Sequence, residues 1–233
     1  MTKPVCVVVG VGEGNGAALA RAFAGEGMAL ALLARGTEFT AALAEELGDA
    51  RAYACDVADP IAVADVFARI RDKLGDPATI LYNAGSGVWG DVEAIGLDDF
   101  EQAWRINAYG ALAISQQAIP AMKAAGSGTI IFIGATASRR GGPRTAAFAP
   151  AKAAQRSLAE SMARSLGPAG IHVALVVIDA IVDLPRTRRS MPDKPDTFFL
   201  KPEDMAATAL WLARQPRSAW TFEADVRPFG EKW

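Results

Sequence analysis

The stretch from Val5 to Phe23 constrains the fold of this chain most, because it predicts a strand, a glycine turn and a helix in succession. The run 5–9 is apolar and almost wholly β-branched, which is typical of a buried parallel strand. Four glycines follow at alternate positions, and glycine lets a backbone turn sharply and approach a ligand without interference from a Cβ atom. From Ala17 onward the alanine-rich sequence favours a helix.

A helix that begins beneath such a turn predicts a site for an anion. Its free N–H groups and the positive end of its dipole point toward the turn, where a dinucleotide pyrophosphate is the usual occupant. The common spacing G-x-G-x-x-G fails, because Asn15 stands where the third glycine belongs. The spacing G-x-x-x-G-x-G fits instead, through Gly10, Gly14 and Gly16, with Gly12 between them. A glycine-rich turn that holds no nucleotide is the alternative.

Strand and helix patterns alternate along the rest of the chain. We expect further strands at 28–34, 51–55, 78–82, 128–133, 171–178 and 219–226, and further helices at 38–47, 60–74, 98–125, 148–166 and 202–213. Residues 179–200 contain three prolines and are expected to be irregular. The alternation predicts an α/β fold: a Rossmann-type, doubly wound parallel sheet of about seven strands with helices on both faces, in a single domain spanning 1–233.

Composition argues against several classes of protein. Hydrophobic residues form 51% of the chain, enough for a large core, and the net charge of −2 gives no support to nucleic-acid or anionic-membrane binding. No apolar run reaches the length of a membrane span, and Met1 leads straight into the first strand with no room for a signal peptide. Cys6 and Cys55 are interpreted as reduced core thiols, with no metal site. We therefore expect a soluble, cytoplasmic protein.

Four features in order resemble the short-chain dehydrogenase/reductase family across nearly the whole chain. They are the glycine spacing, the triplet Asn83-Ala84-Gly85 after the strand at 78–82, Asn107 within the long helix, and Lys152 near the start of a later helix. The resemblance implies a nicotinamide cofactor and hydride transfer to or from a small carbonyl or alcohol substrate. It also implies a homodimer or homotetramer, paired through the long helix and the Lys152 helix.

The resemblance also assigns roles to residues. The glycine turn would hold the pyrophosphate, Asp56 and Val57 would contact the adenine ring, and the backbone of 83–85 would lie near the adenine-side ribose. Lys152 would hydrogen-bond the nicotinamide ribose and lower the pKa of a neighbouring acid. Asn107 would hold a proton-relay water beside that lysine, or else serve only as a helix-kink or capping amide.

The residue after the second strand favours NADP(H) over NAD(H). Arg35 stands where NADP-preferring members of the family carry a basic residue, and a guanidinium can grip a 2′-phosphate with two hydrogen bonds. Glu13, within the glycine turn, argues the other way, because its carboxylate would repel that phosphate. An Arg35 that is merely solvated is the alternative interpretation.

The family pattern breaks at the catalytic acid. The family carries a tyrosine four residues before the lysine, where this chain has Phe148, and a serine that would fall at Ala135. Losing a positioned general acid typically costs about 10²–10⁴ in rate, so an ordinary alcohol dehydrogenase mechanism is not expected. Thr136 and Ser138 are the nearest hydroxyls that could take the place of the serine. A catalytically defective nucleotide sensor or assembly partner is the alternative function.

The substrate side differs from the family as well. Asp179 and Asp183 put carboxylates near the expected reaction centre, as a proton donor or as groups that cap a helix or form hydrogen bonds within the loop. Trp89 either lines a substrate pocket or packs on the surface. The following segment carries basic residues, which form either a solvated surface or an anion clamp: Arg186, Arg188 and Arg189. The substrate itself is not predicted.

Overall fold

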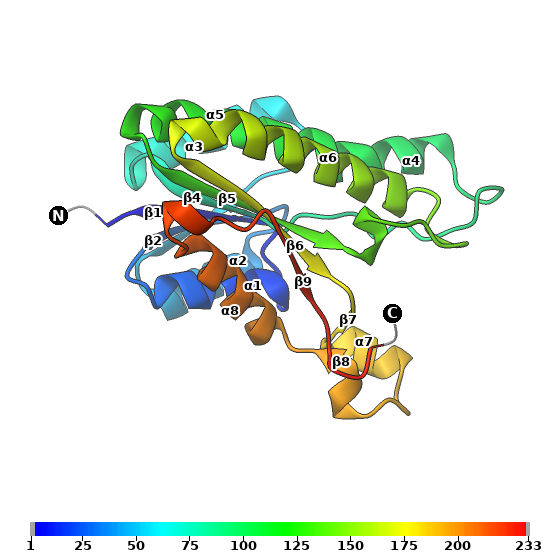
Figure 1. Ribbon diagram of the computed structural model, residues 1–233. Coiled ribbons are helices and arrows are strands. Elements are labelled where there is room, and N and C mark those ends of the chain that lie inside the picture. The colour runs from blue at the N-terminus through cyan, green and yellow to red at the C-terminus, as the bar shows by residue number, and fades with distance from the viewer. Residues whose placement is uncertain (1–2, 232–233) are drawn as a thin grey trace.

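The computed structural model describes residues 3–231 and has three layers, with helices on both faces of a parallel sheet (Figure 1). Seven strands form this sheet in the order β3-β2-β1-β4-β5-β6-β9, and every neighbouring pair is parallel. The predicted α/β doubly wound fold is confirmed. Met1, on which the expectation about a signal peptide rests, lies outside the described residues.

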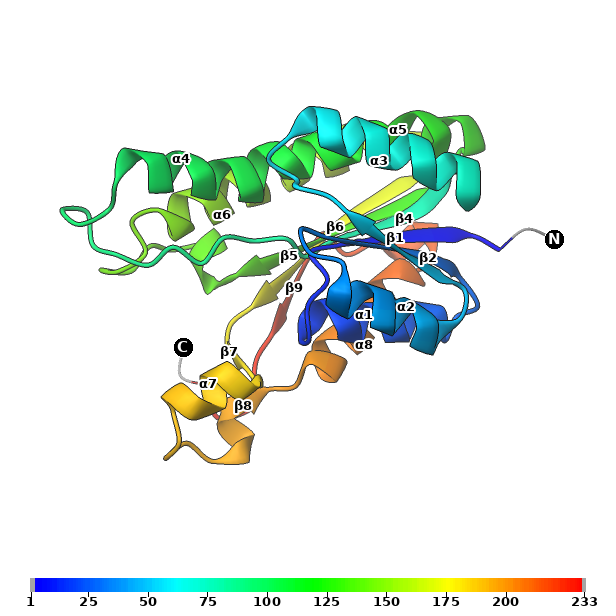
Figure 2. The same ribbon diagram turned by 180° about the vertical axis from the view of Figure 1, so that it is seen from behind.

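The elements follow the predicted alternation closely. The strands of the main sheet are β1 (Val5–Val9), β2 (Ala29–Ala34), β3 (Ala50–Ala54), β4 (Pro77–Tyr82), β5 (Gly128–Ala135), β6 (Ile171–Ile178) and β9 (Glu223–Val226). The helices that cover it are α1 (Asn15–Ala24), α2 (Glu38–Leu47), α3 (Pro60–Lys73), α4 (Leu97–Trp104), α5 (Gly110–Ala125), α6 (Phe148–Leu166) and α8 (Pro202–Ala213). Figure 2 shows α1, α2 and α8 on one face and α3 to α6 on the other.

The central strands are buried because both of their faces are covered. All residues of β1 and β6 are buried, as expected for a parallel sheet between two helical layers. One core cluster, which includes Phe67 and Ile114, lies beneath the layer of α3, α5 and α6. The other, which includes Leu19 and Phe23, lies beneath α1 and α8. The carboxyl edge of the sheet is left for loops and glycines.

The helix expected over 98–125 is three segments, because a π-helical turn interrupts it. Arg105–Tyr109 form this turn between α4 and α5, and Asn107 lies at its centre. The Asn107 Nδ2 atom donates to the carbonyl oxygen of Ala103 at 2.8 Å, which gives the amide a local partner within the helix. The Tyr82 hydroxyl donates to the carbonyl oxygen of Ile106, so β4 also ties down the turn. Such turns inside helices are frequent at functional sites.

The stretch 179–200, expected to be irregular, contains ordered elements: β7 (Ile181–Val182), α7 (Pro185–Ser190) and β8 (Phe199–Leu200). Pro185 is the first residue of α7, a position where proline favours a helix because its missing N–H has no intrahelical acceptor. We call residues 181–200 the lid. The last strand is also shorter than expected, since 217–219 form a 3₁₀ turn before β9.

One guanidinium holds the lid together. Arg188 donates to the two carboxylate oxygens of Asp183 at 2.6 and 2.7 Å and to a carboxylate oxygen of Asp196 at 2.5 Å. Its guanidinium carbon lies 4.2 Å from the centroid of the Phe199 ring. These hydrogen bonds lower the pKa of Asp183 and raise the pKa of Arg188. The arginine therefore joins α7 to both strands of the lid.

Within residues 3–231, none of the helices combines the length and the apolar character that a bilayer crossing requires.

The close packing of α5 against the sheet gives a stability prediction. A Cβ atom on Gly110 would lie 2.6 Å from the Val57 carbonyl oxygen and 2.8 Å from the Tyr82 hydroxyl. We expect Gly110→Ala to lower the free energy of unfolding by about 1–3 kcal/mol, because this core has no space for the added methyl group. Urea unfolding followed by circular dichroism measures the change. Gly25→Ala is the matched control, since Gly25 is also right-handed and its Cβ would meet neighbours only at 3.4 Å or beyond; an equal loss there would contradict the packing argument.

Candidate functional site

A cleft of about 1300 Å³ opens at the carboxyl edge of the sheet, beneath the lid. Its walls come from the glycine turn after β1, the segment after β4, the end of β5, the first turns of α6 and the lid. The strand order reverses between β1 and β4, and ligands of doubly wound sheets bind at this kind of reversal.

Two glycines of the turn, Gly10 and Gly16, have no room for a side chain. Gly10 has φ +83°, and a Cβ on it would lie 2.4 Å from the Ala84 nitrogen. A Cβ on Gly16 would lie 2.6 Å from the Val11 Cα atom. The Asn83 side-chain amide donates to the Gly10 carbonyl oxygen at 2.7 Å and joins the turn to the segment after β4. The turn and this triplet therefore meet.

Helix α1 begins directly at this turn. Its N-cap residue, Gly14, provides no side-chain hydrogen bond to the first turn of the helix, and that turn contains no acidic residue. The exposed N–H groups and the dipole of α1 therefore favour an anion above the turn. Gly12, Asn15 and Gly16 also line the cleft at this point.

Lys152 lies on α6 with its amine deep in the cleft wall. Only 5% of the residue is exposed, and Nζ donates to the Ile133 carbonyl oxygen at 2.8 Å and to Gln155 Oε1 at 3.1 Å. Both partners are neutral, so burial dominates and lowers the pKa of Lys152 from 10.5 to about 7. The amine can therefore take up or release a proton near neutral pH.

Asn107 approaches the same place from the π-helical turn. Its Oδ1 atom is buried and has no hydrogen-bond partner within residues 3–231. A Cβ on Gly85 would lie 3.3 Å from this oxygen and 3.7 Å from Lys152 Nζ, so both polar atoms lie directly behind Gly85. Gly85 and Lys152 line the cleft, whereas Asn107 is fully buried behind them. Gln155 completes the group, because its Nε2 donates to the Asn107 carbonyl oxygen at 2.9 Å. Gln155 is a residue of the site that the family motif does not include. Its position three residues after Lys152 on one helix predicts contact between the two side chains.

The positions expected for the family acid and serine both line the cleft without a hydroxyl. Phe148 begins α6, and its ring lies 5.2 Å, centroid to centroid, from that of Trp89. Trp89 therefore lines the cleft, one of the two roles considered for it. Ala135 ends β5, and its N–H donates to Ser138 Oγ at 3.1 Å. Ser138 is turned toward the backbone and does not line the cleft, so it is not placed to act as a substitute for the serine.

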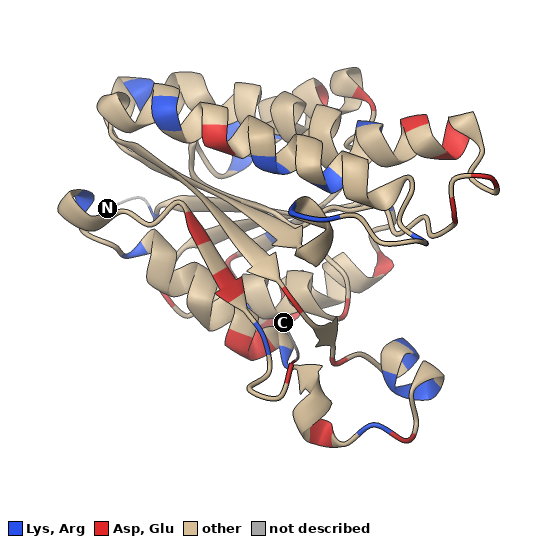
Figure 3. Ribbon diagram, turned by 45° about the vertical axis from the view of Figure 1, so that its right-hand side comes forward, with Lys and Arg blue, Asp and Glu red and all other residues tan. Residues whose placement is uncertain are grey.

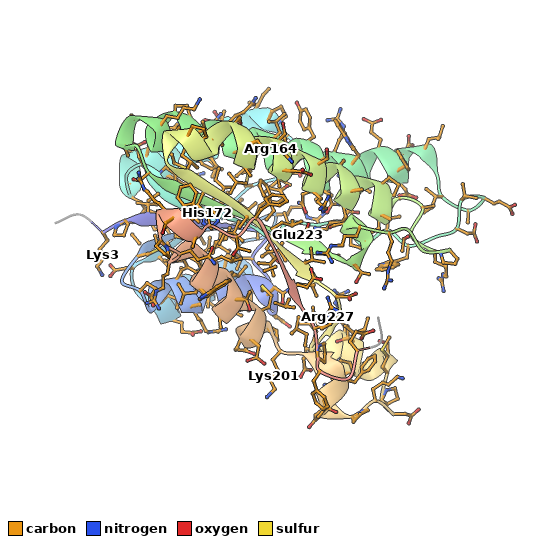
Figure 4. All side chains as sticks on the ribbon, viewed as in Figure 1. Lys3, Arg164, His172, Lys201, Glu223 and Arg227 are labelled. Carbon is orange, nitrogen blue, oxygen red and sulfur yellow. The ribbon has the colours of Figure 1, made fainter. Side chains whose placement is uncertain are left out.

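Thr136 forms the polar contact at the end of β5. Its hydroxyl donates to Asp179 Oδ1 at 2.5 Å, and both residues line the cleft. The second carboxylate oxygen of Asp179 lies 3.6 Å from Arg227 Nε. Arg227 follows β9, the strand that Glu223 begins (Figure 4). Thr136 therefore has an anionic acceptor, and the Asp179 carboxylate has a cationic neighbour.

The lid packs one leucine against the glycine turn and holds the Asp183 carboxylate away from the cleft. A Cβ on Gly14 would lie 2.4 Å from Leu184 Cδ2, so this leucine rests on the turn. Asp183 does not line the cleft, because Arg188 holds its carboxylate within the lid. Of the two roles considered for Asp183, the structure therefore shows the hydrogen-bonding role within the loop and not that of a proton donor in the cleft.

Three residues expected on the adenine side are not part of the cleft wall. Arg35 is exposed after β2, Asp56 accepts a hydrogen bond from the Ala58 N–H at 3.0 Å, and Val57 is buried. Their assignment to the cofactor therefore rests on the family resemblance alone.

Within residues 3–231 there is no cluster of side chains suited to a metal ion.

The doubly wound sheet and the glycine turn beneath α1 define a Rossmann-type fold. The family model described as short chain dehydrogenase matches residues 4–191, and the chain belongs to this family.

Two curated relatives of this chain carry different names within the family. It is 32% identical over 139 residues to 17-beta-hydroxysteroid dehydrogenase type 1 of Homo sapiens, a match that covers 60% of this chain and only 42% of the human protein. It is 28% identical over 206 residues to "Inactive 2-(S)-hydroxypropyl-CoM dehydrogenase 2" of Xanthobacter autotrophicus, which covers 82% of this chain and 90% of the relative.

Two solved structures share the fold over nearly the full length. A short-chain dehydrogenase from Rhodopseudomonas palustris is 32% identical with a TM-score of 0.83, covering 97% of this chain and 99% of that one. A metagenomic short-chain oxidoreductase in complex with NADP is 26% identical with a TM-score of 0.85, covering 97% of each chain.

The buried amine of Lys152 predicts a pH dependence of stability. The unfolded chain keeps this lysine protonated up to about pH 10.5, whereas the folded chain releases the proton above about pH 7. The unfolded state therefore binds more protons across this range, and unfolding free energy should rise with pH. Lys152→Met removes the titrating group, so the native protein should gain stability relative to this variant between about pH 7 and 10. Urea unfolding of both proteins across this range measures the difference, and parallel curves would contradict the assignment.

Proposed function

We propose that this protein is an oxidoreductase of the short-chain dehydrogenase type that binds NADP(H) in the cleft and has an altered acid site. The observation that carries the proposal is that a backbone cradle suited to a pyrophosphate and the buried amine of Lys152 open into one cleft. The fit rests on the glycines, since Gly10 and Gly16 have no space for a Cβ. It rests also on the buried Asn107 Oδ1 atom, which has no partner within residues 3–231.

The assigned residues divide the cleft into two ends. The glycine turn and the start of α1 would bind the pyrophosphate through backbone N–H groups. Lys152 would hydrogen-bond the nicotinamide ribose, and Asn107 Oδ1 would orient a water beside that amine. A bound nicotinamide cofactor supplies hydride transfer. The substrate, a small carbonyl or alcohol, would lie between Phe148, Ala135 and the lid.

Hydride transfer at the altered acid site requires either another proton donor or a polarised substrate that reacts without a tyrosine acid. Phenylalanine has no ionisable proton, so Lys152 cannot activate Phe148. Thr136 directly follows Ala135 in the sequence and lines the cleft, and its hydrogen bond to the Asp179 carboxylate fixes the direction of its hydroxyl. We propose Thr136 as the group that takes over the orienting role of the family serine.

A catalytically defective nucleotide sensor or assembly partner is the second candidate. The missing tyrosine and serine favour it, as does the similarity to a relative whose name calls it inactive. A bound cofactor stabilises a folded protein by mass action whether or not it reacts, so a retained site does not require catalysis.

The remaining proposals follow the family. We propose that the described elements form one functional domain that assembles into a homodimer or homotetramer. Exposed apolar side chains on α4, Phe100 and Trp104, offer a surface for that pairing. Cys6 and Cys55 are both buried and free, which suits a reducing cytoplasm.

The choice of cofactor can be tested at Arg35. We expect NADPH to bind more tightly than NADH, because the guanidinium would bind the 2′-phosphate through charge-assisted hydrogen bonds. Arg35→Gln should weaken NADPH by about tenfold and leave NADH unchanged. Calorimetry with both nucleotides measures these affinities. Tighter binding of NADH by the native protein would contradict the assignment. Arg51→Gln, on the neighbouring strand, is the control: it removes the same charge and should leave the affinity for NADPH unchanged.

Restoring the acid distinguishes the two candidate functions. Phe148→Tyr with Ala135→Ser should raise NADPH consumption on a panel of aldehydes and ketones by about 10²–10⁴, the usual contribution of a positioned acid. Adding Lys152→Met to this double variant should abolish the gain. Turnover by the double variant alone would support the sensor or assembly role. Native turnover unaffected by Lys152→Met would contradict the proposed site.

A further inference from the structure

Three arginines line the cleft around its lid: Arg140, Arg186 and Arg189. Arg140 follows the 3₁₀ turn Thr136–Ser138 at the end of β5, whereas the other two belong to α7. Residues three apart on a helix lie on one face, so Arg186 and Arg189 share the face of α7 that meets the cleft. Figure 3 shows the concentration of basic residues on α7.

These three guanidiniums differ from their neighbours because they have no partner. Arg188, between the two on α7, is bound by Asp183 and Asp196. Arg139, directly before Arg140, donates to Asp225 at 2.7 Å and to Glu223 at 2.6 Å. Across residues 3–231, the guanidiniums of the three cleft arginines form neither an ion pair nor a hydrogen bond.

The acidic side chains of the cleft do not balance this charge. Glu13 lies in the glycine turn, next to Gly14, which Leu184 of the lid contacts. Asp179 accepts the Thr136 hydroxyl and has Arg227 beside it. Glu231, near the end of the described chain, is the remaining carboxylate in the wall, against three guanidiniums. With Asp179 engaged by Thr136 and Arg227, the two carboxylates of Glu13 and Glu231 stand against three guanidiniums, so the wall of the cleft that includes the lid carries a net positive charge.

The wall beside these arginines is aromatic. Trp89 and Phe148 pair with ring centroids 5.2 Å apart, and 58% of Trp89 is exposed. Phe198, from the lid, also lines the cleft. The exposed Trp89 ring favours a flat apolar group, and such a surface in a cleft with cations selects amphipathic anions.

We infer that the lid end of the cleft takes substrates with a flat apolar body and an oxyanion group (carboxylate, sulfonate or phosphate) held by Arg186, Arg189 and Arg140. Guanidiniums suit this role because they bind oxyanions with two parallel hydrogen bonds and stay charged at every physiological pH. The inference rests on the proposed function in assigning this end of the cleft to the substrate. It adds the class of substrate, which the family does not specify.

A matched pair of fluorescent probes tests the inference without turnover. 1-Anilinonaphthalene-8-sulfonate and N-phenyl-1-naphthylamine share the same rings and differ by the sulfonate group. Both are titrated into the full chain saturated with NADP⁺, which keeps the nucleotide end of the cleft occupied. We expect the sulfonate to bind at least about tenfold more tightly, and the variant Arg140→Gln/Arg186→Gln/Arg189→Gln to lose that preference. The neutral probe should bind the native and triple variants equally.

Arg144→Gln is the matched control, because Arg144 lies on the same loop as Arg140 and does not line the cleft. It should leave the preference for the sulfonate intact. Equal affinity for the two probes, a preference that survives in the triple variant, or an equal loss in Arg144→Gln would each overturn the inference. Thermal unfolding of each variant identifies any loss of fold, which exposed arginines without partners should not cause. If NADP⁺ does not bind, the proposed function fails, and the same probe comparison without nucleotide still decides the charge preference.

Discussion

The burial of one amine is the constraint on which the arrangement of the cleft depends. Lys152 reaches the cleft wall from α6, and an ammonium in that position must find acceptors or lose its proton. The carbonyl oxygen at the end of β5 and the Gln155 side chain supply the acceptors, and Gln155 in turn binds the backbone of the π-helical turn. Helix α6, strand β5 and the turn around Asn107 are thereby joined through polar contacts that an apolar residue at 152 could not make.

The fold could be predicted from the sequence because its signals are local and agree with one another. The β-branched run at Val5–Val9, the glycine turn and the alternation of strands with helices each indicate a parallel sheet, and α6 begins and ends at the expected residues. The site could be predicted in part, because the spacing of the glycines, Asn83, Asn107 and Lys152 marks residues that the topology brings to one edge.

The remainder depends on contacts between segments that sequence spacing does not reveal. The lid was expected to be irregular because of its prolines, yet Pro185 starts a helix and Arg188 joins it to two strands. A kink at Asn107 was one of the roles considered for this residue, and its amide does bond locally to Ala103. The hydrogen bond from Tyr82 to the π-helical turn comes from another strand, and sequence spacing does not reveal it. Asp183 looked equivalent to Asp179 by position, and only the ion pair with Arg188 separates them.

The contact between Leu184 and Gly14 has a kinetic consequence. A ligand that approaches the Cα atom of Gly14 must displace the leucine side chain, and the leucine belongs to the same lid segment that Arg188 holds together. Entry and departure of a nucleotide would therefore be coupled to movement of the lid. The residence time of the nucleotide would then be set by how often the lid opens, and less by the strength of the contacts beneath it.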